Sequence, residues 1–237
     1  MKTLVICSGG LDSITLAHKV AKERALSSLL TFDYAQRHKK EIHYAEQCAK
    51  TLGVPHHCID ISHVGTMLSG SALTDDIEVP DGHYAQDTMK ATIVPNRNAI
   101  MLTIGYGVAA AAGDAAVAAA IHAGDHFIYP DCRPEFAQSF ELMQNQALEG
   151  FASIQLYTPF IHQSKADIAR EAAKLGLDIK QTWSCYKGGD IHCGRCGTCV
   201  ERQEALSLAN VPDPTPYADA EFWKQSTPSQ NVKTGAV

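Results

Sequence analysis

Glycines and short polar side chains follow directly on the first apolar run of the chain. Residues 4–7 are apolar, residues 8–13 read SGGLDS, and a helical pattern begins at Leu11. An apolar run that ends in Gly-Gly before a helix predicts a buried parallel strand leading into a helix N-terminus. Such an N-terminus offers unpaired N–H donors and a partial positive charge, and glycines let these donors approach a ligand. The stretch therefore predicts an anion site suited to phosphate.

The side chains of this stretch add to the backbone donors. Ser8 and Ser13 can donate hydroxyl hydrogen bonds, and Asp12 can hold a Mg²⁺ ion that bridges phosphate oxygens. The stretch differs from the common phosphate loop GxxxxGK[ST], because no lysine follows its glycines. The competing interpretation is a tight turn without a ligand. The predicted phosphate-binding residues are Ser8, Gly9, Gly10, Leu11, Asp12 and Ser13.

Two basic residues stand where they could meet the same anion. Lys165 lies in the first turn of a predicted helix that Ser164 and Asp167 open at capping-box spacing. A cation there opposes the helix dipole, which favours contact of Lys165 with phosphate. Arg97 directly precedes another predicted helix, with Asn98 as the expected N-cap, and could meet an anion there. A surface salt bridge is the alternative for Arg97.

Four cysteines lie within 15 residues of one another near the C-terminus, in the spacing C-x7-C-x2-C-x2-C. In a chain without a secretory signal, this cluster predicts a metal site and not a disulfide framework. Four thiolates form a closed tetrahedral site, which is typical of a structural Zn²⁺, here one per chain. A redox pair and an iron–sulfur cluster are the alternatives. The expected ligands are Cys185, Cys193, Cys196 and Cys199.

Strand and helix patterns alternate along the chain and must position these residues. The alternation predicts an α/β fold with a doubly wound, mostly parallel five-stranded sheet flanked by helices. We expect a nucleotide-binding domain at residues 1–180, a zinc-binding segment at residues 181–209 and an extended tail at residues 210–237. Residues 62–87 predict a mobile cover over the site. Strands are expected at residues 4–7, 26–32, 55–61, 115–121 and 154–158, and helices at residues 11–22, 41–52, 98–112, 134–146, 164–175 and 200–209.

Composition limits the classes of function. The chain has 237 residues, of which 45% are hydrophobic and 19% charged, as in ordinary globular proteins. A net charge of −6 argues against a stable nucleic-acid partner, because such proteins usually carry a basic excess. The N-terminus shows no apolar signal region, and glycines and an aspartate interrupt the most apolar stretch, residues 99–123. We therefore expect a cytoplasmic protein without a membrane span.

Several motifs occur in one order and identify a family. They are SGGLDS at 8–13, FDYAQRH at 32–38, VPNRN at 94–98, YPDCRPEF at 129–136, TP at 158–159, SKADIA at 164–169, TWSCY at 182–186 and CGRCGTC at 193–199. Over about residues 1–209 the chain resembles the 7-cyano-7-deazaguanine (preQ0) synthases of the queuosine pathway, a family of N-type ATP pyrophosphatases. YPDCRPEF together with TWSCY is the specific part of this resemblance. Ala35 and Asn96 stand where the family commonly has glycine.

The resemblance implies an adenine nucleotide alpha hydrolase-like fold and a ligase reaction. ATP would convert the carboxylate of 7-carboxy-7-deazaguanine into an acyl-adenylate, and ammonia would convert that into an amide. A second activation of the amide oxygen would leave the nitrile. Free ammonia is the expected nitrogen source, because nothing in the chain resembles a glutaminase domain.

The resemblance also implies roles for single residues. Residues 8–13 would bind the pyrophosphate portion of ATP with Mg²⁺, and Lys165 and Arg97 would neutralise the phosphates. Asp131 and Arg133 are the candidates for recognising the deazaguanine edge or its carboxylate, and the four cysteines would hold zinc. The expected catalytic residues are Asp12, Lys165 and Arg97.

Three other functions share parts of these patterns. A tRNA-modifying thiolase or a lysidine-type ligase has the same loop but usually needs a basic surface and an RNA-binding region. A nucleotide-sensing module with a zinc ribbon would bind ATP without turnover. Another amidotransferase, such as an NAD synthetase, is the third alternative, but the cysteine cluster and the YPDCRPEF motif fit it poorly. The sequence leaves the oligomeric state open, with a homodimer as one candidate.

Overall fold

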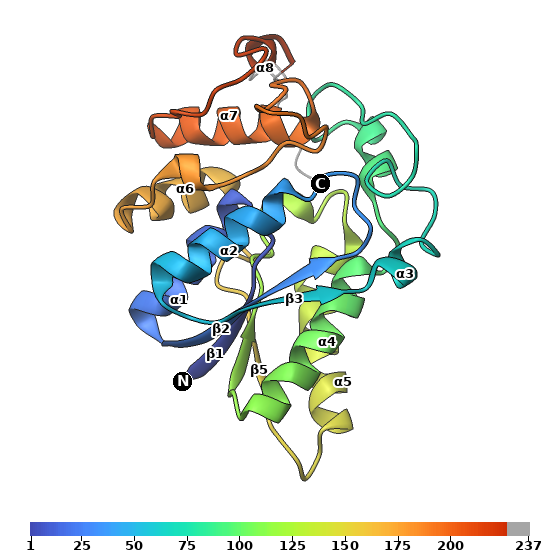
Figure 1. The fold of residues 1–237 in the computed structure, drawn as a ribbon, viewed down its shortest axis with the longest axis vertical. Helices are drawn as coiled ribbons and strands as arrows, with labels where there is room; N and C mark the ends of the chain where they lie inside the picture. Colours follow the sequence, from blue (N-terminus) through green and yellow to red (C-terminus); the bar gives the residue numbers. More distant parts are fainter. Residues whose placement is uncertain (227–237) are drawn as a thin grey trace, which may run out of the picture.

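A parallel sheet forms the centre of the molecule. The computed structural model describes residues 1–226. The strands are β1 (Lys2–Ile6), β2 (Ala25–Asp33), β3 (His56–Asp60), β4 (Ala116–Ala118) and β5 (Gln155–Tyr157). They lie in the order β3-β2-β1-β4-β5, and every neighbouring pair is parallel (Figure 1). The parallel, doubly wound sheet expected from the sequence is confirmed.

Helices cover both faces of the sheet. The helices are α1 (Leu11–Glu23), α2 (Lys40–Leu52), α3 (Ser62–Gly65), α4 (Arg97–Ala112), α5 (Pro134–Ala147), α6 (Lys165–Lys174), α7 (Gly197–Ala209) and α8 (Phe222–Ser226), with 3₁₀ turns η1 (Asp87–Thr92), η2 (Ala123–Asp125), η3 (Pro130–Cys132) and η4 (Ile179–Gln181). Val5 and Leu29 point into a core with α1, α2 and α6. Their neighbours Leu4 and Leu30 point into a second core with α4 and α5. Because successive strand residues face opposite sides, a strand buried on both faces reads as a continuous apolar run.

The strand order reverses between β1 and β4, which pair with each other. In open α/β sheets, ligands bind beyond the carboxyl ends of the strands at such a point. Residues 8–13 leave β1 there, and the residues after β4 leave beside them. β4 ends at Ala118, before the expected end at residue 121, and the chain then turns along the wall of a cavity.

The start of α4 differs from the expected one. Asn98 is the predicted N-cap, but α4 begins at Arg97 and its N-cap is Asn96, which has a φ of 58° and makes no side-chain capping hydrogen bond. The carboxylate of Asp131 accepts the backbone N–H of Asn98 at 3.2 Å instead. The prediction for Asn98 is wrong because the cap comes from a distant loop. The predicted capping box of Ser164 and Asp167 on α6 is confirmed.

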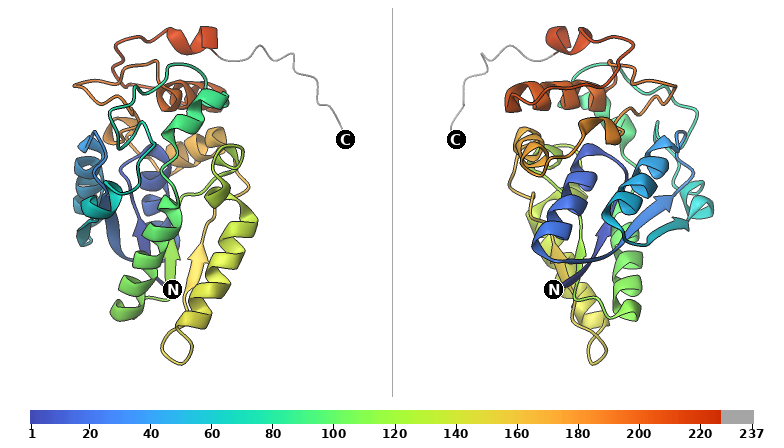
Figure 2. Two further views of the ribbon diagram at one scale, coloured as in Figure 1. Left: turned by 90° about the vertical axis from the view of Figure 1, so that its right-hand side faces the viewer. Right: turned by 60° about the vertical axis from the view of Figure 1, so that its left-hand side comes forward.

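The C-terminal part of the chain lies beyond the carboxyl edge of the sheet. In Figures 1 and 2, α7 stacks on α6 at that end, and α8 lies further out. The predicted extended tail is wrong for residues 222–226, which form α8 because Asp219 Oδ1 accepts the N–H groups of Glu221 and Phe222. The rest of that prediction, residues 227–237, lies outside the described residues. Within residues 1–226, no helix has the length and apolar character required to cross a membrane.

Residues 62–87 are anchored to the C-terminal segment. Ala72 and Val79 are buried in a small core that also contains the cysteine cluster. The backbone N–H of Gly82 donates to the carbonyl of Arg195 at 3.0 Å. Residues 62–87 thus lie on the side of the molecule where we expected a cover over the site. Their mobility stays a prediction.

Candidate active site

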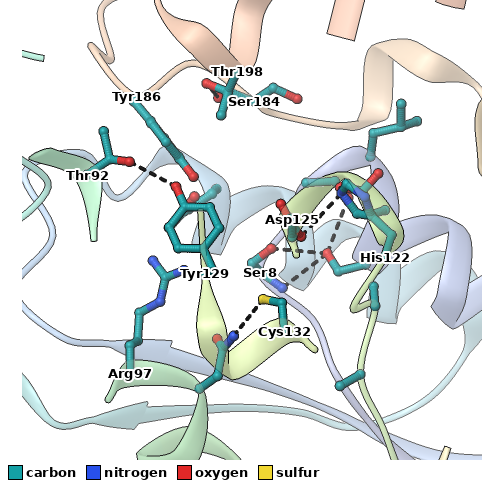
Figure 3. Close-up of a pocket in the computed structure, with 18 of the residues that line it drawn as sticks. Ser8, Thr92, Arg97, His122, Asp125, Tyr129, Cys132, Ser184, Tyr186 and Thr198 are labelled. Carbon is teal, nitrogen blue, oxygen red and sulfur yellow. Dashed lines mark hydrogen bonds and ion pairs between the residues drawn. The ribbon is translucent and has the colours of Figure 1, made fainter. Parts of the chain in front are cut away.

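One cavity lies at the switch point between β1 and β4, and Figure 3 shows part of its lining. Loops of the sheet and helices α1, α2, α4, α6 and α7 all contribute side chains to it. Its lining divides into two chemically different groups. We call the first the phosphate end, which comprises Ser8, Gly10, Asp12, Ser13, His122, Asp125, Lys165 and Glu201. We call the second the aromatic end, which comprises Tyr34, Glu41, Arg97, Tyr129, Cys132 and Tyr186.

The loop after β1 has the geometry of an anion site. Gly9 has a φ of 90°, and a Cβ atom there would lie 1.9 Å from the carbonyl oxygen of Glu41, so only glycine fits. Helix α1 begins after Gly10 without a side-chain cap, which leaves its first N–H groups free for a ligand. Ser13 Oγ accepts from the backbone N–H of Ser8 at 3.2 Å and holds the loop in this shape.

Lys165 stands between two carboxylates. Its Nζ lies 2.9 Å from Asp12 Oδ2 and 2.9 Å from Glu201 Oε2. Burial alone would lower the pKa of Lys165, but these carboxylates raise it above its usual value, so the ammonium stays charged. Burial pushes the pKa of Asp12 upward, yet the charges of Lys165 and His122 bring it below its usual value.

His122 and Asp125, which follow β4, lie beside this ion pair. His122 is 1% exposed, and its Nδ1 accepts the backbone N–H of Gly124 at 3.1 Å. In the neutral ring, Nε2 therefore carries the proton. That Nε2 faces Asp125 Oδ2 at 3.3 Å and Asp12 Oδ2 at 3.8 Å, and Figure 3 shows His122 turned toward Asp125. Burial raises the pKa of Asp125 to about 6.

The carboxylates of the phosphate end fit a magnesium ion. Asp12 Oδ1 is buried and has no hydrogen-bond partner among the described residues. Proteins usually hold Mg²⁺ through one or two carboxylates together with the phosphates of the substrate. Asp12 and Asp125 are the residues that could do so. Leu11, the first residue of α1, is buried in the core and also lines the cavity.

The aromatic end surrounds one cation with phenols. Arg97 Nη1 donates to Tyr34 Oη at 3.3 Å, and the guanidinium lies 5.7 Å from the centre of the Tyr34 ring. Burial alone would lower the pKa of Arg97, but the surrounding tyrosines raise it. Burial also raises the pKa of Tyr34 to about 12, so its hydroxyl is neutral at physiological pH. Figure 3 shows Arg97 beside Tyr129, on the opposite side of the view from His122.

Glu41 joins the aromatic end from the first turn of α2. Its Oε1 accepts from Gln36 Nε2 at 3.4 Å. Burial raises the pKa of Glu41 to about 7, although the nearby charge of Arg97 opposes this shift. Burial thus favours the neutral form of this carboxyl group.

Asp131 and Arg133 point to other partners and do not belong to the lining of this cavity. Asp131 caps α4, as described above, and Arg133 Nε donates to the carbonyl of His126 at 3.0 Å on the exposed surface. Cys132 between them does line the cavity, where its Sγ accepts from Asn98 Nδ2 at 3.2 Å. Recognition of the base by Asp131 and Arg133 stays a prediction.

The four predicted metal ligands come together. The Sγ atoms of Cys185, Cys193, Cys196 and Cys199 all lie within 4.8 Å of one another. Four sulfurs at this spacing fit around one ion, as the tetrahedral thiolate set requires. The backbone N–H of Cys196 donates to Cys193 Sγ at 3.3 Å, and such bonds stabilise the thiolate form.

Residues 181–209, which we call the cysteine segment, are attached directly to residues 8–13, which we call the phosphate loop. The backbone N–H of Trp183 donates to the carbonyl of Gly9 at 2.9 Å. Thr198 Oγ1 donates to the carbonyl of Ser184 at 2.7 Å. This bond connects the start of α7 to the residue that follows Trp183. The cavity is thus closed by residues from both ends of the sequence.

Comparison with known proteins shows the family to which this chain belongs. The family model described as queuosine biosynthesis protein QueC matches residues 2–210. The chain belongs to this family. A 7-cyano-7-deazaguanine synthase from Ruegeria pomeroyi is 65% identical over 224 residues, covering 94% of this chain and 97% of that protein. A second one, from Brucella ovis, is 62% identical over 232 residues, covering 98% of this chain and 100% of that protein.

A solved structure supports the fold at much lower identity. NMN synthetase from Francisella tularensis superposes with a TM-score of 0.50 at 14% identity, over 94% of this chain and 83% of that one. The likeness shows that the two chains share a fold. The QueC family membership and this fold agree with the resemblance inferred from the motifs.

The structure brings most predicted residues together and adds several that the sequence did not reveal. Tyr34, Tyr129 and Tyr186 lie inside recognised motifs, and the first two lie in polar stretches after predicted strands, so these positions could have marked them as lining. His122 and Asp125 likewise follow a predicted strand. Glu201 gave no signal, because a glutamate in a predicted C-terminal helix is usually solvated. The added residues are Tyr34, Glu41, His122, Asp125, Tyr129, Tyr186 and Glu201.

Proposed function

We propose that this chain makes 7-cyano-7-deazaguanine from 7-carboxy-7-deazaguanine, ammonia and ATP, as a ligase of queuosine biosynthesis. Membership of the QueC family and two relatives of 65% and 62% identity with that synthase name support this function. The observation that carries it is one cavity with a phosphate loop at one end and an arginine among tyrosines at the other. Joining a planar carboxylate to ATP requires both groups to be held in one site.

In the first step, a carboxylate oxygen of the substrate attacks the α-phosphorus of ATP. The bond from that phosphorus to pyrophosphate breaks, and pyrophosphate leaves with the electron pair. We assign residues 8–13 and Lys165 to the leaving pyrophosphate, because N–H donors and a buried ammonium stabilise the charge that develops there. Asp12 and Asp125 would hold Mg²⁺, which neutralises phosphate charge.

The aromatic end suits the deazaguanine. The phenol rings offer flat apolar surfaces against which a fused ring can pack. The planar guanidinium of Arg97 can donate two parallel hydrogen bonds to a carboxylate. We therefore assign Arg97 to the substrate carboxylate, where it neutralises charge as the carboxylate approaches ATP. Contacts of Asp131 and Arg133 with the substrate would require the loop after β4 to rearrange.

The later steps use the same cavity twice. Ammonia attacks the acyl carbon, AMP leaves, and loss of a proton gives the primary amide. The amide oxygen then attacks the α-phosphorus of a second ATP, and pyrophosphate leaves. The C–O bond of this adenylate breaks, AMP leaves with the oxygen, and the nitrogen loses its two protons. The nitrile remains. Free ammonia is the nitrogen source in this proposal.

We also propose that the four cysteines hold a structural Zn²⁺. Sulfurs within 4.8 Å of one another fit a single ion, whereas an iron–sulfur cluster bonds its cysteines to different irons and requires wider spacing. Zinc would fix the start of α7, because its N-cap Cys196 and its third residue Cys199 are two of the ligands. Elemental analysis of the purified protein should give one zinc and no iron per chain, and chelation should lower its melting temperature.

A mass-spectrometric product assay tests the proposed function. The protein is incubated with 7-carboxy-7-deazaguanine, ammonium, Mg²⁺ and ATP. Nitrile, AMP and pyrophosphate are the expected products. ATP binding without conversion of the acid would overturn the proposal, and tight binding of tRNA in a filter assay would then favour the thiolase. Sedimentation of the same preparation measures the oligomeric state, for which a homodimer is one candidate.

A further inference from the structure

Glu201 reaches the phosphate end from the cysteine segment. It lies on α7, two residues after the ligand Cys199, and its side chain is 8% exposed. Its Oε2 lies 2.9 Å from Lys165 Nζ. A carboxylate beside a site for polyphosphate repels the ligand, so its presence requires a reason other than phosphate binding.

The position of Glu201 is fixed on both sides. Before it, Thr198 donates to the carbonyl of Ser184 at 2.7 Å. After it, the fully buried Arg202 donates to Thr182 Oγ1 at 2.6 Å and to Ser184 Oγ at 3.2 Å. These hydrogen bonds fix the first turns of α7, so the carboxylate of Glu201 has a defined position.

Asp12 and Glu201 compete for one ammonium. Asp12 Oδ2 also lies 2.9 Å from Lys165 Nζ, and Asp12 is the residue that would hold Mg²⁺. Without Glu201, Lys165 would have Asp12 as its remaining close carboxylate and would pair with it fully. Magnesium at Asp12 would then compete with the lysine for that carboxylate, and bound magnesium would leave the ammonium without a close carboxylate partner to hold it in place.

We propose that Glu201 is a positioning residue that shares the Lys165 ammonium with Asp12, so that the lysine keeps a partner beside the phosphates when Asp12 receives magnesium. This inference rests on the role of Lys165 in the proposed function. It gives the cysteine segment a part in the reaction through one hydrogen-bonded carboxylate.

The first test is Glu201→Gln, which keeps the size of the side chain and removes its charge. We expect kcat to fall about 30-fold and the Mg²⁺ concentration for half-maximal activity to rise about fivefold. The KM for 7-carboxy-7-deazaguanine should stay within twofold. The matched control is Glu171→Gln on α6, which removes a similar pair at 3.1 Å from Lys19 outside the cavity and should change none of these values.

A double-mutant cycle distinguishes positioning from other roles. In a Lys165→Met background, Glu201→Gln should have no further effect on residual activity, because the residue that it positions is gone. Additive effects would overturn the inference and point to Glu201 as a direct ligand of the metal or substrate. Lys165→Met alone tests the proposed function, since near-normal turnover would reject the role of the lysine itself.

A measurement on the folded protein without substrate completes the test. The acetylation rate of Lys165, followed by peptide mass spectrometry, should change at least threefold in Glu201→Gln and stay unchanged in Glu171→Gln. An unchanged rate in Glu201→Gln would contradict the inference. If Glu201→Gln does not fold, Glu201→Asp, which keeps the charge but shortens the reach by one methylene, is expected to show the same changes.

Discussion

The two ends of the cavity solve different electrostatic problems. At the phosphate end, Lys165, Asp12 and Glu201 form a chain of close ion pairs, so each buried charge has an opposite charge beside it. At the aromatic end, the charge of Arg97 is surrounded by neutral phenols, and Glu41 has a pKa raised to about 7. The first arrangement suits a charged, solvated polyphosphate. The second suits a flat, largely neutral ring.

The backbones of the two ends differ in the same way. At the phosphate end, Gly9 occupies a left-handed conformation that no other residue could share, because Glu41 lies against it. At the aromatic end, Ala35 and Asn96 have φ values of 64° and 58° without being glycine. These are the two positions at which the resemblance to the family leads us to expect glycine. The phosphate loop is thus built without backbone strain, whereas the turns around the aromatic end carry it.

The largest expected effect lies at the phosphate end. Lys165→Ala removes a buried cation that stabilises the leaving pyrophosphate, and turnover should fall about 1000-fold, or about 4 kcal/mol. Nitrile and AMP formation are measured together. Lys174→Ala on the same helix is the control, because the side chain of Lys174 is 75% exposed. Turnover within a few-fold of wild type for Lys165→Ala would contradict the assignment.

The next effect concerns stability at the aromatic end. The folded pKa of Glu41 is about 7 against an ordinary value of 4.5, so the folded state holds the proton more tightly. Stability contributed by that proton is present below pH 4.5 and is lost as the pH rises to 7, by up to about 3 kcal/mol. Urea unfolding of wild type relative to Glu41→Gln should show this loss, and the exposed Glu46→Gln should not. If the difference in the free energy of unfolding between wild type and Glu41→Gln did not change with pH, the burial of Glu41 would be contradicted.

A smaller effect separates the roles of the two cations. Arg97→Lys keeps the charge but loses the planar pair of donors, so kcat/KM for the deazaguanine acid should fall about 30-fold, or about 2 kcal/mol. The KM for ATP should stay within twofold. Steady-state kinetics with each substrate varied in turn provides both values. A matching rise in the KM for ATP would return Arg97 to the phosphates, as the sequence predicts.

The smallest effect tests the backbone difference. Ala35→Gly should stabilise the protein by about 1 kcal/mol, because glycine adopts a φ of 64° without the steric cost that alanine has there. Chemical denaturation measures the change. Ala45→Gly, in the regular interior of α2, should destabilise the protein instead. Destabilisation by Ala35→Gly would show that the turn is not strained.

The same contrast explains what the sequence could predict. The phosphate loop and the cysteine ligands follow from local patterns, since residues close in the sequence form each of them, and the parallel sheet follows from the regular alternation of strand and helix patterns. The aromatic end is assembled from separate elements: Tyr34 follows β2, Arg97 starts α4 and Tyr186 lies in the cysteine segment. No local spacing connects these residues. Asn98 shows the same limit, because its helix is capped by Asp131 from another loop.

The hydrogen bond between Trp183 and Gly9 has a consequence for how the protein is made. A ribosome synthesises the phosphate loop about 190 residues before the turn with Glu201. The nascent sheet can fold early, since its strands all precede residue 158. Its ATP site, however, lacks a wall and a carboxylate until the cysteine segment emerges. Synthesis order therefore delays catalytic competence until that segment has folded onto the sheet.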